Sequence, residues 1–416
     1  MGKDLIILVT LVLSFSLFAE EIKKTEITKN SKKINNGNFA WENGRLYFRS
    51  EKNFSLKFDG RIYLDFAHYS GSDYAFDGSD LRRGRIAFKV KLYKLWRAEF
   101  GIDVADNKVE TKDMWMARLF GNNSMLKVGQ FKVPFSMEEL TSSLIITFME
   151  RSLANTFAPG RRMSIGYNYW GKYGQISTSV FGQEFGDSTE KKGDEEYGGA
   201  LRGSLSYLTS NIVIHLGIGS FIETTEDNQG IIKKDSLPES KISKIKYLDT
   251  GEIKDVKYNH VSNIELALSY KFIRLQAEYM FNIVFRENNK RNLSFSGYYA
   301  HIGVFLTGEK KPYSIKAGKF LLVHPKRDWG AVELAFRFSS LNLNDIGINE
   351  NTERYEGGTA KQYTLGLTWF FNRNFRLMFN YSYADHSKQA DGNRNYKVPN
   401  NGIDMHILQS RFLANF

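Results

Sequence analysis

The chain of 416 residues contains no cysteine. Disulfides, thiolate metal sites and a lipid-modified N-terminal cysteine are therefore excluded, and an exported protein of this sequence must be stabilised by other means. Long apolar runs are also scarce. After residue 19 no stretch of about 18 apolar residues occurs, which excludes a helical membrane span. No Pro/Gly/Ser-rich linker divides the chain, so we expect one large closed architecture rather than several domains.

The first nineteen residues have the composition of a secretory signal. Lys3 precedes an apolar run from Leu5 to Ala19, and the charged stretch EEIKK follows. The run is too short to cross a bilayer, so we predict a signal peptide over 1–19 with cleavage near Ala19. Export without a helical anchor leaves three destinations: the periplasm, the medium, or a barrel in the outer membrane.

The segment from Arg83 to Leu92, RGRIAFKVKL, alternates strictly between two kinds of side chain. The cations stand at odd positions and the bulky apolar residues at even positions: Arg83, Arg85, Lys89 and Lys91 against Ile86, Phe88, Val90 and Leu92. A period of two indicates a β-strand with one apolar and one cationic face. A soluble sandwich could contain such a strand, so this segment alone does not distinguish a soluble protein from a membrane protein.

The same two-faced pattern recurs along the chain, at about 54–66, 96–104, 262–271, 273–285, 329–339 and 361–383. Short and long connections alternate between the segments, as in outer-membrane barrels with tight periplasmic turns and longer outer loops. The last strand ends in Phe416, with Phe412 on the same face. We therefore predict an all-β protein, a transmembrane antiparallel β-barrel.

A simple count gives seventeen strands, one too many for an antiparallel barrel with both termini on one side. The weakest candidate is Tyr313 to Leu321, because Lys316, Gly318 and Lys319 break its faces. We assign it to a long periplasmic connection between 307 and 328, which leaves about sixteen strands.

Five segments, in this order, resemble a known family: VGQFKVPFSMEELTSSLIITFMERS at 128–152, APGRRMSIGY at 158–167, LTGEKKPY at 306–313, WGAVELAFRFSSLNLND at 329–345 and LGLTWFFNRNFRLMFNYSY at 365–383. They are similar to the phosphate-selective porin O and P family, over nearly the whole chain from about residue 54. The resemblance implies a homotrimeric anion channel in outer-membrane lipid of a Gram-negative bacterium. It implies a barrel over 54–416 after a periplasmic segment over 20–53, with no cofactor and no metal.

The resemblance also implies a constriction, formed by a third outer loop that folds inward, here at about 132–159. The family's arginine pair falls on Arg82 and Arg83, and its constriction residues fall on Asp113, Thr141, Ser142 and Ser143. One position departs from the family. Phosphate-selective members place a lysine three residues before the first of these serines, where this chain has Glu139, and a carboxylate there would repel an oxyanion.

If the apolar faces point outward, the lumen receives more cations than carboxylates. The cations expected along the anion pathway are Lys57, Arg61, Arg82, Arg83, Arg85, Lys89, Arg162 and Arg337, and the carboxylates are Asp59, Asp65, Glu99, Asp103 and Glu333. A charged lining in a low-dielectric tube concentrates counter-ions, and arginine suits phosphate-like anions because its fork donates two parallel hydrogen bonds. The alternative for each arginine is a salt bridge that only stiffens the wall.

The predicted function is passive diffusion of small anions, phosphate or related oxyanions, through a water-filled outer-membrane pore. The alternative within this architecture is a general porin for small hydrophilic solutes, which Glu139 would favour.

Other classes fit less well. An enzyme is not expected, because the seven histidines are scattered and neither GxSxG nor HExxH occurs. The formal charge of +11 does not indicate nucleic acid, because the cations are spread over alternating strands. An adhesin would need binding loops. The long charged loop at 223–257 is the best candidate, although it reads more simply as a solvated or partly folded cap.

Overall fold

The computed structural model describes residues 39–42, 44–50, 53–71, 75–185, 196–225, 230–347, 353–387 and 402–416. The predicted signal peptide over 1–19 lies outside these residues. No helix within them is long and apolar enough to cross a membrane.

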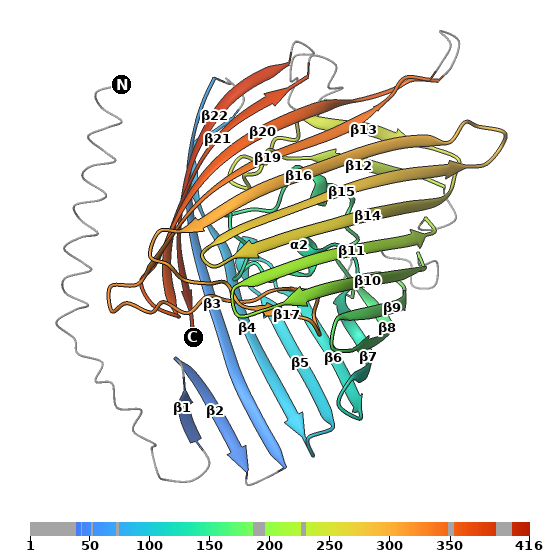
Figure 1. Cartoon of the computed structure of the whole chain (residues 1–416). Coiled ribbons are helices and arrows are strands. Elements are labelled where there is room, and N and C mark those ends of the chain that lie inside the picture. The colour runs from blue at the N-terminus through green and yellow to red at the C-terminus, as the bar shows by residue number, and fades with distance from the viewer. Residues whose placement is uncertain are drawn as a thin grey trace, which may run out of the picture.

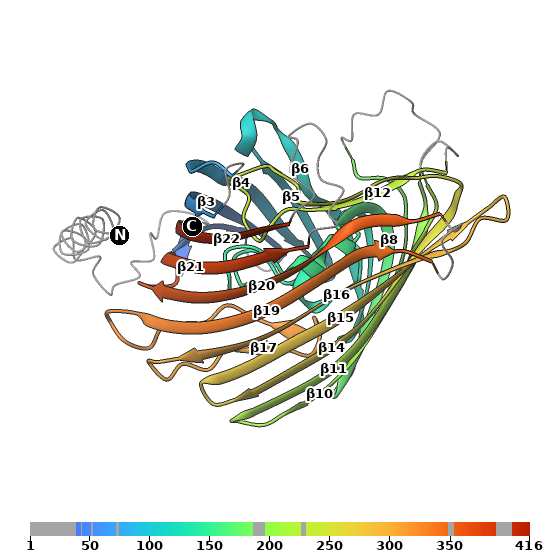
Figure 2. The same cartoon turned by 90° about the horizontal axis from the view of Figure 1, so that it is seen from above.

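Sixteen antiparallel strands form a closed barrel (Figures 1 and 2). They are β3 (Phe54–Ser70), β4 (Gly78–Leu92), β5 (Trp96–Asp103), β6 (Glu110–Phe120), β7 (Ser124–Lys132), β8 (Arg161–Trp170), β9 (Gly174–Phe181), β10 (Gly198–Leu208), β11 (Ile212–Glu223), β14 (Val256–Tyr270), β15 (Ile273–Arg286), β16 (Leu293–Phe305), β19 (Ala331–Asp345), β20 (Tyr355–Phe370), β21 (Phe375–His386) and β22 (Ile403–Asn415). Pairing of β22 with β3 closes the ring, with Arg411 opposite Asp65. The predicted fold class and strand number are confirmed.

The alternation of side chains decides which face meets lipid. On β4, Ile86 and Phe88 are exposed on the outside of the barrel, whereas Arg85 and Lys89 on the other face are only partly accessible. The same exposure of every second residue, mostly apolar, occurs on β3 and continues around the wall. An apolar belt of this extent is stable only against lipid, so the apolar faces point outward as predicted.

The connections differ at the two ends of the barrel. At one end, tight turns join each pair of strands except β16 and β19: Tyr93 and Lys94 both have positive φ, 48° and 60°, as in the primed turns of hairpins. At the other end, longer segments join them, including the short 3-10 helix η1 (Ala105–Asn107). The C-terminus lies at the short-turn end (Figure 1).

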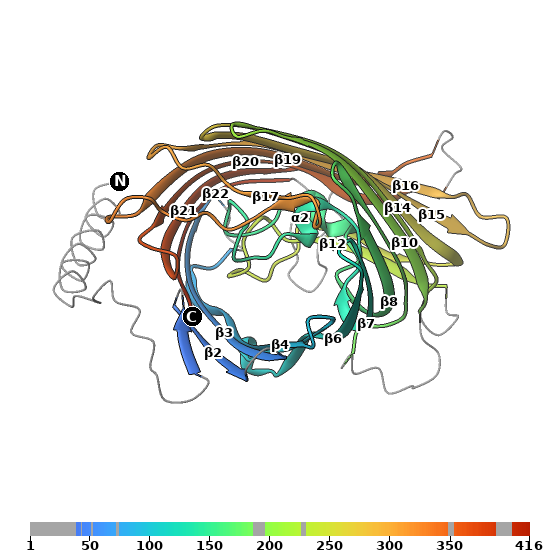
Figure 3. The same cartoon turned by 60° about the horizontal axis from the view of Figure 1, so that its bottom comes forward.

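Three of the longer connections lie inside the ring of strands (Figure 3). We call them the constriction loop (133–160), the outer arm (230–255) and the inner arm (306–330). The constriction loop contains α2 (Met137–Leu140) and the 3-10 helix η2 (Leu153–Phe157); the outer arm contains β12 (Ile232–Ser236) and β13 (Leu248–Ile253); the inner arm contains β17 (Tyr313–Ser314) and β18 (Lys319–Phe320). The predicted inward fold of the constriction loop is confirmed, because Phe135, Leu144 and Phe148 are buried.

The two arms correct two expectations. The outer arm belongs to the 223–257 loop, which we expected as a solvated or partly folded cap, yet Ile245, Tyr247 and Leu248 are at most 3% exposed. The inner arm stays outside the barrel sheet, as expected, but it is not a simple periplasmic connection. Its Phe320 is buried with Met137 of the constriction loop, since apolar side chains of the two segments pack together in the lumen.

A further hairpin precedes the barrel. Strand β1 (Phe39–Glu42) pairs with β2 (Arg45–Ser50), and β2 pairs with the first residues of β3. This hairpin covers part of the segment 20–53, whose periplasmic location stays a prediction.

Candidate functional site

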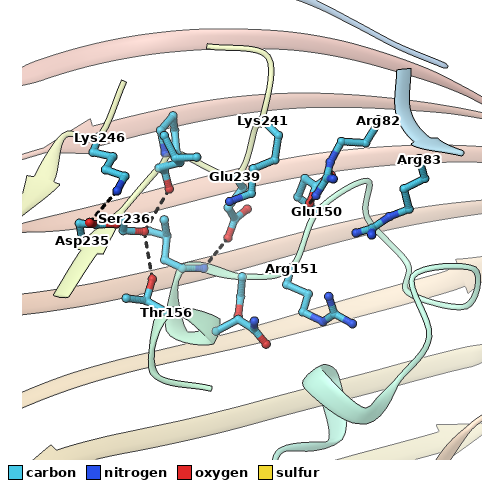
Figure 4. A pocket seen from close by; sticks show the side chains of 15 residues that line it. Arg82, Arg83, Glu150, Arg151, Thr156, Asp235, Ser236, Glu239, Lys241 and Lys246 are labelled. Carbon is cyan, nitrogen blue, oxygen red and sulfur yellow. Dashed lines mark hydrogen bonds and ion pairs between the residues drawn. The ribbon is translucent and has the colours of Figure 1, made fainter. Parts of the chain in front are cut away.

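A β-bulge brings two consecutive arginines to the lumen. Tyr63 on β3 pairs with Arg83, but Leu64 pairs with Leu81, so Arg82 is an extra residue on β4. A bulge re-aims the side chains beside it. Arg82 therefore reaches Glu150 of the constriction loop, with 2.8 Å between Nε and Oε1, while Arg83 lies 3.9 Å from Asp103. Figure 4 shows both arginines beside Glu150.

The arginines deeper in the pore have fewer carboxylates than cations around them. Asp103 lies 2.6 Å from Arg85 and also accepts from the wall backbone at Gly84. Arg85 in turn is repelled by Arg161 and Arg61. Since these cations share one water-filled space, the wall of β3, β4 and β8 presents a positive potential to the lumen.

Only one of the three predicted hydroxyl residues is open to the lumen. Ser142 is partly accessible, and its Oγ accepts a hydrogen bond of 3.0 Å from Nη1 of Arg61. Thr141 is buried and donates to the carbonyl of Met137. Ser143 is buried 3.5 Å from the hydroxyl of Tyr63. Ser142 is therefore the hydroxyl that a passing ion can reach.

Both predicted constriction carboxylates are ion-paired. Asp113 lies 2.7 Å from Nη2 of Arg161. Glu139 lies 2.8 Å from Lys132 and 3.3 Å from Arg151. These two cations hold the pKa of Glu139 down at about 2 against the opposing effect of its burial. The repulsion expected from Glu139 is thus compensated by two neighbours.

Toward the short-turn end, several cations gather around one carboxylate. Asp59 lies 3.1 Å from Lys57, 3.2 Å from Lys89 and 3.8 Å from Arg61. Lys89 also pairs with Glu99 at 3.1 Å. Because two carboxylates serve three cations, this part of the lumen keeps a positive excess.

Two predicted pathway residues are placed differently. Arg337 is 1% exposed and is held by Glu239 of the outer arm and, at 3.5 Å, by Glu138 of the constriction loop. Its position suits anchoring of both segments rather than contact with ions. Arg162 pairs with Glu196 at 2.9 Å, while the adjacent Arg161 faces Asp113.

Arg161 and the lysines of the arms were missed by sequence reasoning. A cavity of about 360 Å³ at the long-loop end is lined by Arg82, Arg83, Arg151, Lys241 and Lys246, among others (Figure 4). Lys246 pairs with Asp235 at 2.7 Å. The closely spaced lysines of SKISKIKY at 240–247 can be seen in the sequence. Only the inward fold of the outer arm shows that Lys241 and Lys246 line the cavity.

An apolar outer belt, a lumen lined by charged side chains and a loop folded inward to narrow it together define an outer-membrane porin. The comparisons agree. The sequence pattern of the phosphate-selective porin O and P family matches residues 56–416. The chain therefore belongs to this family, and it is a porin of the outer membrane of Gram-negative bacteria.

The individual relatives share a low sequence identity with this chain. Porin O of Pseudomonas aeruginosa is 24% identical over 383 residues, covering 83% of this chain and 86% of that protein. An uncharacterized protein of Caulobacter vibrioides is 24% identical over 395 residues, covering 88% and 76%.

Solved structures share the fold at about 10% identity. Pseudomonas putida OprB has a TM-score of 0.55 and covers 88% of this chain and 95% of its own. Vibrio cholerae OmpT, an outer membrane protein solved in a trimer form, has a TM-score of 0.54 and covers 88% and 100%.

Proposed function

We propose that this porin passes small anions in preference to cations, with phosphate-like oxyanions among its solutes. The observation that carries the proposal is the excess of cations beside the constriction. Arg85 lies within electrostatic range of Arg61 and of Arg161. Four arginines line this region and share three carboxylates, which balance them only in part: Arg61, Arg83, Arg85 and Arg161 against Asp59, Asp103 and Asp113. Guanidinium groups remain charged at every physiological pH and bind oxyanions through paired donors.

The path would run from the cavity at the outer end, past Arg82 and Arg83, to the constriction at Arg61 and Ser142. It would continue past Lys57 and Lys89 to the periplasmic end. A series of weak sites of this kind permits both entry and exit, because no single site holds the ion too tightly. The chemistry needed is diffusion, and the chain acts as a channel rather than an enzyme.

The test is electrical. The purified pore in a planar bilayer with a potassium chloride gradient should give a reversal potential of the sign for anion preference. Inorganic phosphate added to chloride should then reduce the current, because a bound oxyanion delays the smaller ion. A reversal potential near zero or of cation sign would refute the proposal.

The alternative of a general porin rested on Glu139. Its two ion pairs with Lys132 and Arg151 cancel the charge that favoured it, so we keep the anion-selective channel. A general pore would conduct chloride equally well with and without phosphate.

We further propose a homotrimer in the membrane. The barrel exterior is apolar around its circumference, and one structure with the same fold supports the proposal by precedent: OmpT is described in a trimer form. Closed rotational symmetry is the common solution for such assemblies.

A further inference from the structure

The tight turns of the barrel carry charge of one sign. They lie at 93–95, 121–123, 171–173, 209–211, 271–272 and 371–374. Their charged residues are all cations, namely Lys94, Lys172, Lys271 and Arg373, and these turns contain neither Asp nor Glu. The connections at the other end contain both signs, as in ADNKV at 105–109. We call the tight turns, with the strand ends beside them, the basic rim.

Arg118 lies at the edge of the basic rim, on the side of the wall that faces lipid. It is exposed, stands two residues before the end of β6, and pairs across the sheet with Trp96 of β5. Its guanidinium group lies 5.7 Å from the ring centroid of Trp96 and 5.1 Å from that of Phe120. Because aromatic faces attract a cation, the two rings hold this group at one depth in the membrane surface.

The other side chains around Arg118 on this face are apolar. Met116, two residues further into the membrane on β6, is 57% exposed, and Leu126, opposite Arg118 on β7, is 37% exposed. Among the described residues, Arg118 has no carboxylate partner. A guanidinium group has five N–H donors, and it is unfavourable beside hydrocarbon unless they are satisfied. The site therefore favours an anion that lies at the membrane surface.

The same pairing of a cation with an exposed ring recurs at other places on this end of the barrel. The distances from the cation to the ring centroid are 5.0 Å for Lys172 and Tyr173, 5.3 Å for Lys271 and Tyr270, and 5.4 Å for Arg327 and Trp329. All of these side chains are exposed. The pairs belong to separate parts of the ring: the β8–β9 turn, the β14–β15 turn and the segment before β19. Cations on aromatic rings thus follow the rim around the barrel.

At the long-loop end, a comparable pair is organised differently. Arg286 of β15 lies 5.5 Å from the ring centroid of Tyr355, but both residues are buried, and Arg286 pairs with Glu353 at 2.8 Å. That guanidinium group already has its anion within the protein. Lys172 and Lys271, by contrast, are exposed and have no carboxylate partner among the described residues.

The depth of these cations selects the kind of anion. Aromatic girdles of outer-membrane barrels lie at the level of the lipid headgroups, so cations held over such rings lie at the level of the headgroup phosphates. A guanidinium group donates two parallel hydrogen bonds to phosphate oxygens, and lysine binds them as a point charge. Basic residues at a membrane surface attract lipids of net negative charge. A zwitterionic lipid is attracted less, because its ammonium group compensates its phosphate.

We propose that the basic rim binds anionic phospholipids of the periplasmic leaflet, with Arg118, between Trp96 and Phe120, as a site for the lipid phosphate. The guanidinium group donates to the phosphodiester oxygens, and Met116 and Leu126 contact the acyl chain beside it. The site lies outside the lumen, so the lipid is a partner of the barrel wall and not a solute of the pore.

The experiment uses the purified pore in a neutral detergent, with brominated phosphatidylglycerol as the anionic probe and brominated phosphatidylcholine as the zwitterionic one. Bromine quenches tryptophan fluorescence on contact, and Trp96 lies in the proposed site. The half-quenching concentration is compared between the native pore, Arg118→Gln, Arg118→Lys and the control Lys310→Gln. Lys310 also lies at the short-turn end, but its ammonium group donates to the carbonyls of Thr209 and Ser210.

Phosphatidylglycerol should quench the native pore at a severalfold lower concentration than phosphatidylcholine. Arg118→Gln should raise the half-quenching concentration of phosphatidylglycerol about tenfold, as expected for the loss of charge-assisted hydrogen bonds. Arg118→Lys should lie between the two, because it keeps the charge but not the paired donors. Lys310→Gln should stay within about twofold of the native value. The double variant Lys172→Gln with Lys271→Gln should also weaken quenching, which tests the basic rim separately from Arg118.

Equal quenching of the native pore by the two lipids overturns the proposal, as does an Arg118→Gln pore that binds phosphatidylglycerol like the native one. Displacement of phosphatidylglycerol by inorganic phosphate would assign the site to free phosphate instead. A changed mass of Arg118→Gln in light scattering, with unchanged lipid binding, would assign this face to a second copy of the chain. The reversal potential of Arg118→Gln should stay native in every case, because Arg118 lies outside the lumen.

Discussion

At the residue scale, the charge balance around Asp103 is the feature on which anion preference most depends. One carboxylate lies between Arg83 and Arg85, at 3.9 and 2.6 Å. A salt bridge that only stiffened the wall would pair one cation with one acid. Here one carboxylate neutralises only one of the two guanidinium groups. The two arginines therefore both stiffen the wall and leave a positive charge facing the lumen.

Replacing both arginines by alanine should therefore shift the reversal potential toward zero in a salt gradient. Since field strength in the tube follows the net lining charge, we expect the ratio of anion to cation permeability to fall severalfold. Arg118→Ala is the matched control, because Arg118 lies over Trp96 and Phe120 on the outer face. Unchanged reversal potentials in the double variant would show that the two arginines serve the wall alone.

The titration of Lys319 gives a second prediction at this scale. Its burial, with the neighbouring cations Arg202, Lys127 and Arg151, lowers the pKa of Lys319 to about 8, and Asp113 opposes the shift. The ammonium is thus charged below about pH 8 and neutral above it.

The preference of the native pore for anions over cations should fall between about pH 7 and pH 9, because the lumen loses a positive charge as Lys319 is deprotonated. The reversal potential in a potassium chloride gradient measures this preference. Lys319→Arg, which keeps its charge, should show a flatter profile. Superimposable profiles would mean that Lys319 does not contribute to the charge of the pore lining.

At the element scale, the three luminal segments depend on one another. Glu239 of the outer arm accepts hydrogen bonds from Leu153 of the constriction loop and from Arg337 and Thr364 of the wall. The inner arm is tied to the constriction loop through Lys311, which donates to the carbonyl of Ile145 at 2.8 Å. The width of the pore is thus set jointly by these contacts.

Glu239→Ala should destabilise the protein, because it leaves the buried guanidinium group of Arg337 with Glu138, at 3.5 Å, as its remaining carboxylate partner. Removal of one member of a buried ion pair costs about 3 kcal/mol, which urea-induced unfolding in detergent can measure. Single-channel records should also become noisier as the outer arm loosens. Glu252→Ala is the control, since Glu252 belongs to the same arm but is exposed. Equal stability of the two variants would contradict the anchoring role.

These elements also show what sequence reasoning can reach. The wall was predictable because alternation records which side chain meets lipid and which meets water, as in Ile86 and Phe88 against Arg85. The inward course of the inner arm was not, because its burial depends on contacts between Phe320 and Met137, far apart in the sequence. For the same reason, the charge of Glu139 could be read from the sequence but its compensation by Arg151 could not.

At the scale of the whole molecule, a closed ring of sixteen strands has no free edge, so its stability is that of a single unit. The proposed homotrimer adds a prediction. Light scattering of the detergent-solubilised protein should give three times the mass of one chain, and bilayer insertions should appear as groups of three equal conductance steps. Single steps from a species with the mass of one chain would contradict it.

The pairing of β3 with β22 links closure of the barrel to the folding of its interior. Every luminal segment lies between these two strands in the sequence, and Arg411 on β22 grips both Asp65 on β3 and Glu150 of the constriction loop, at 2.7 Å each. Arg411 therefore joins the closing pair of strands to the constriction loop that lies inside them. A barrel closed without the constriction loop in place would leave Arg411 with Asp65 as its one carboxylate partner, so closure of the wall and inward folding of the loop stabilise each other.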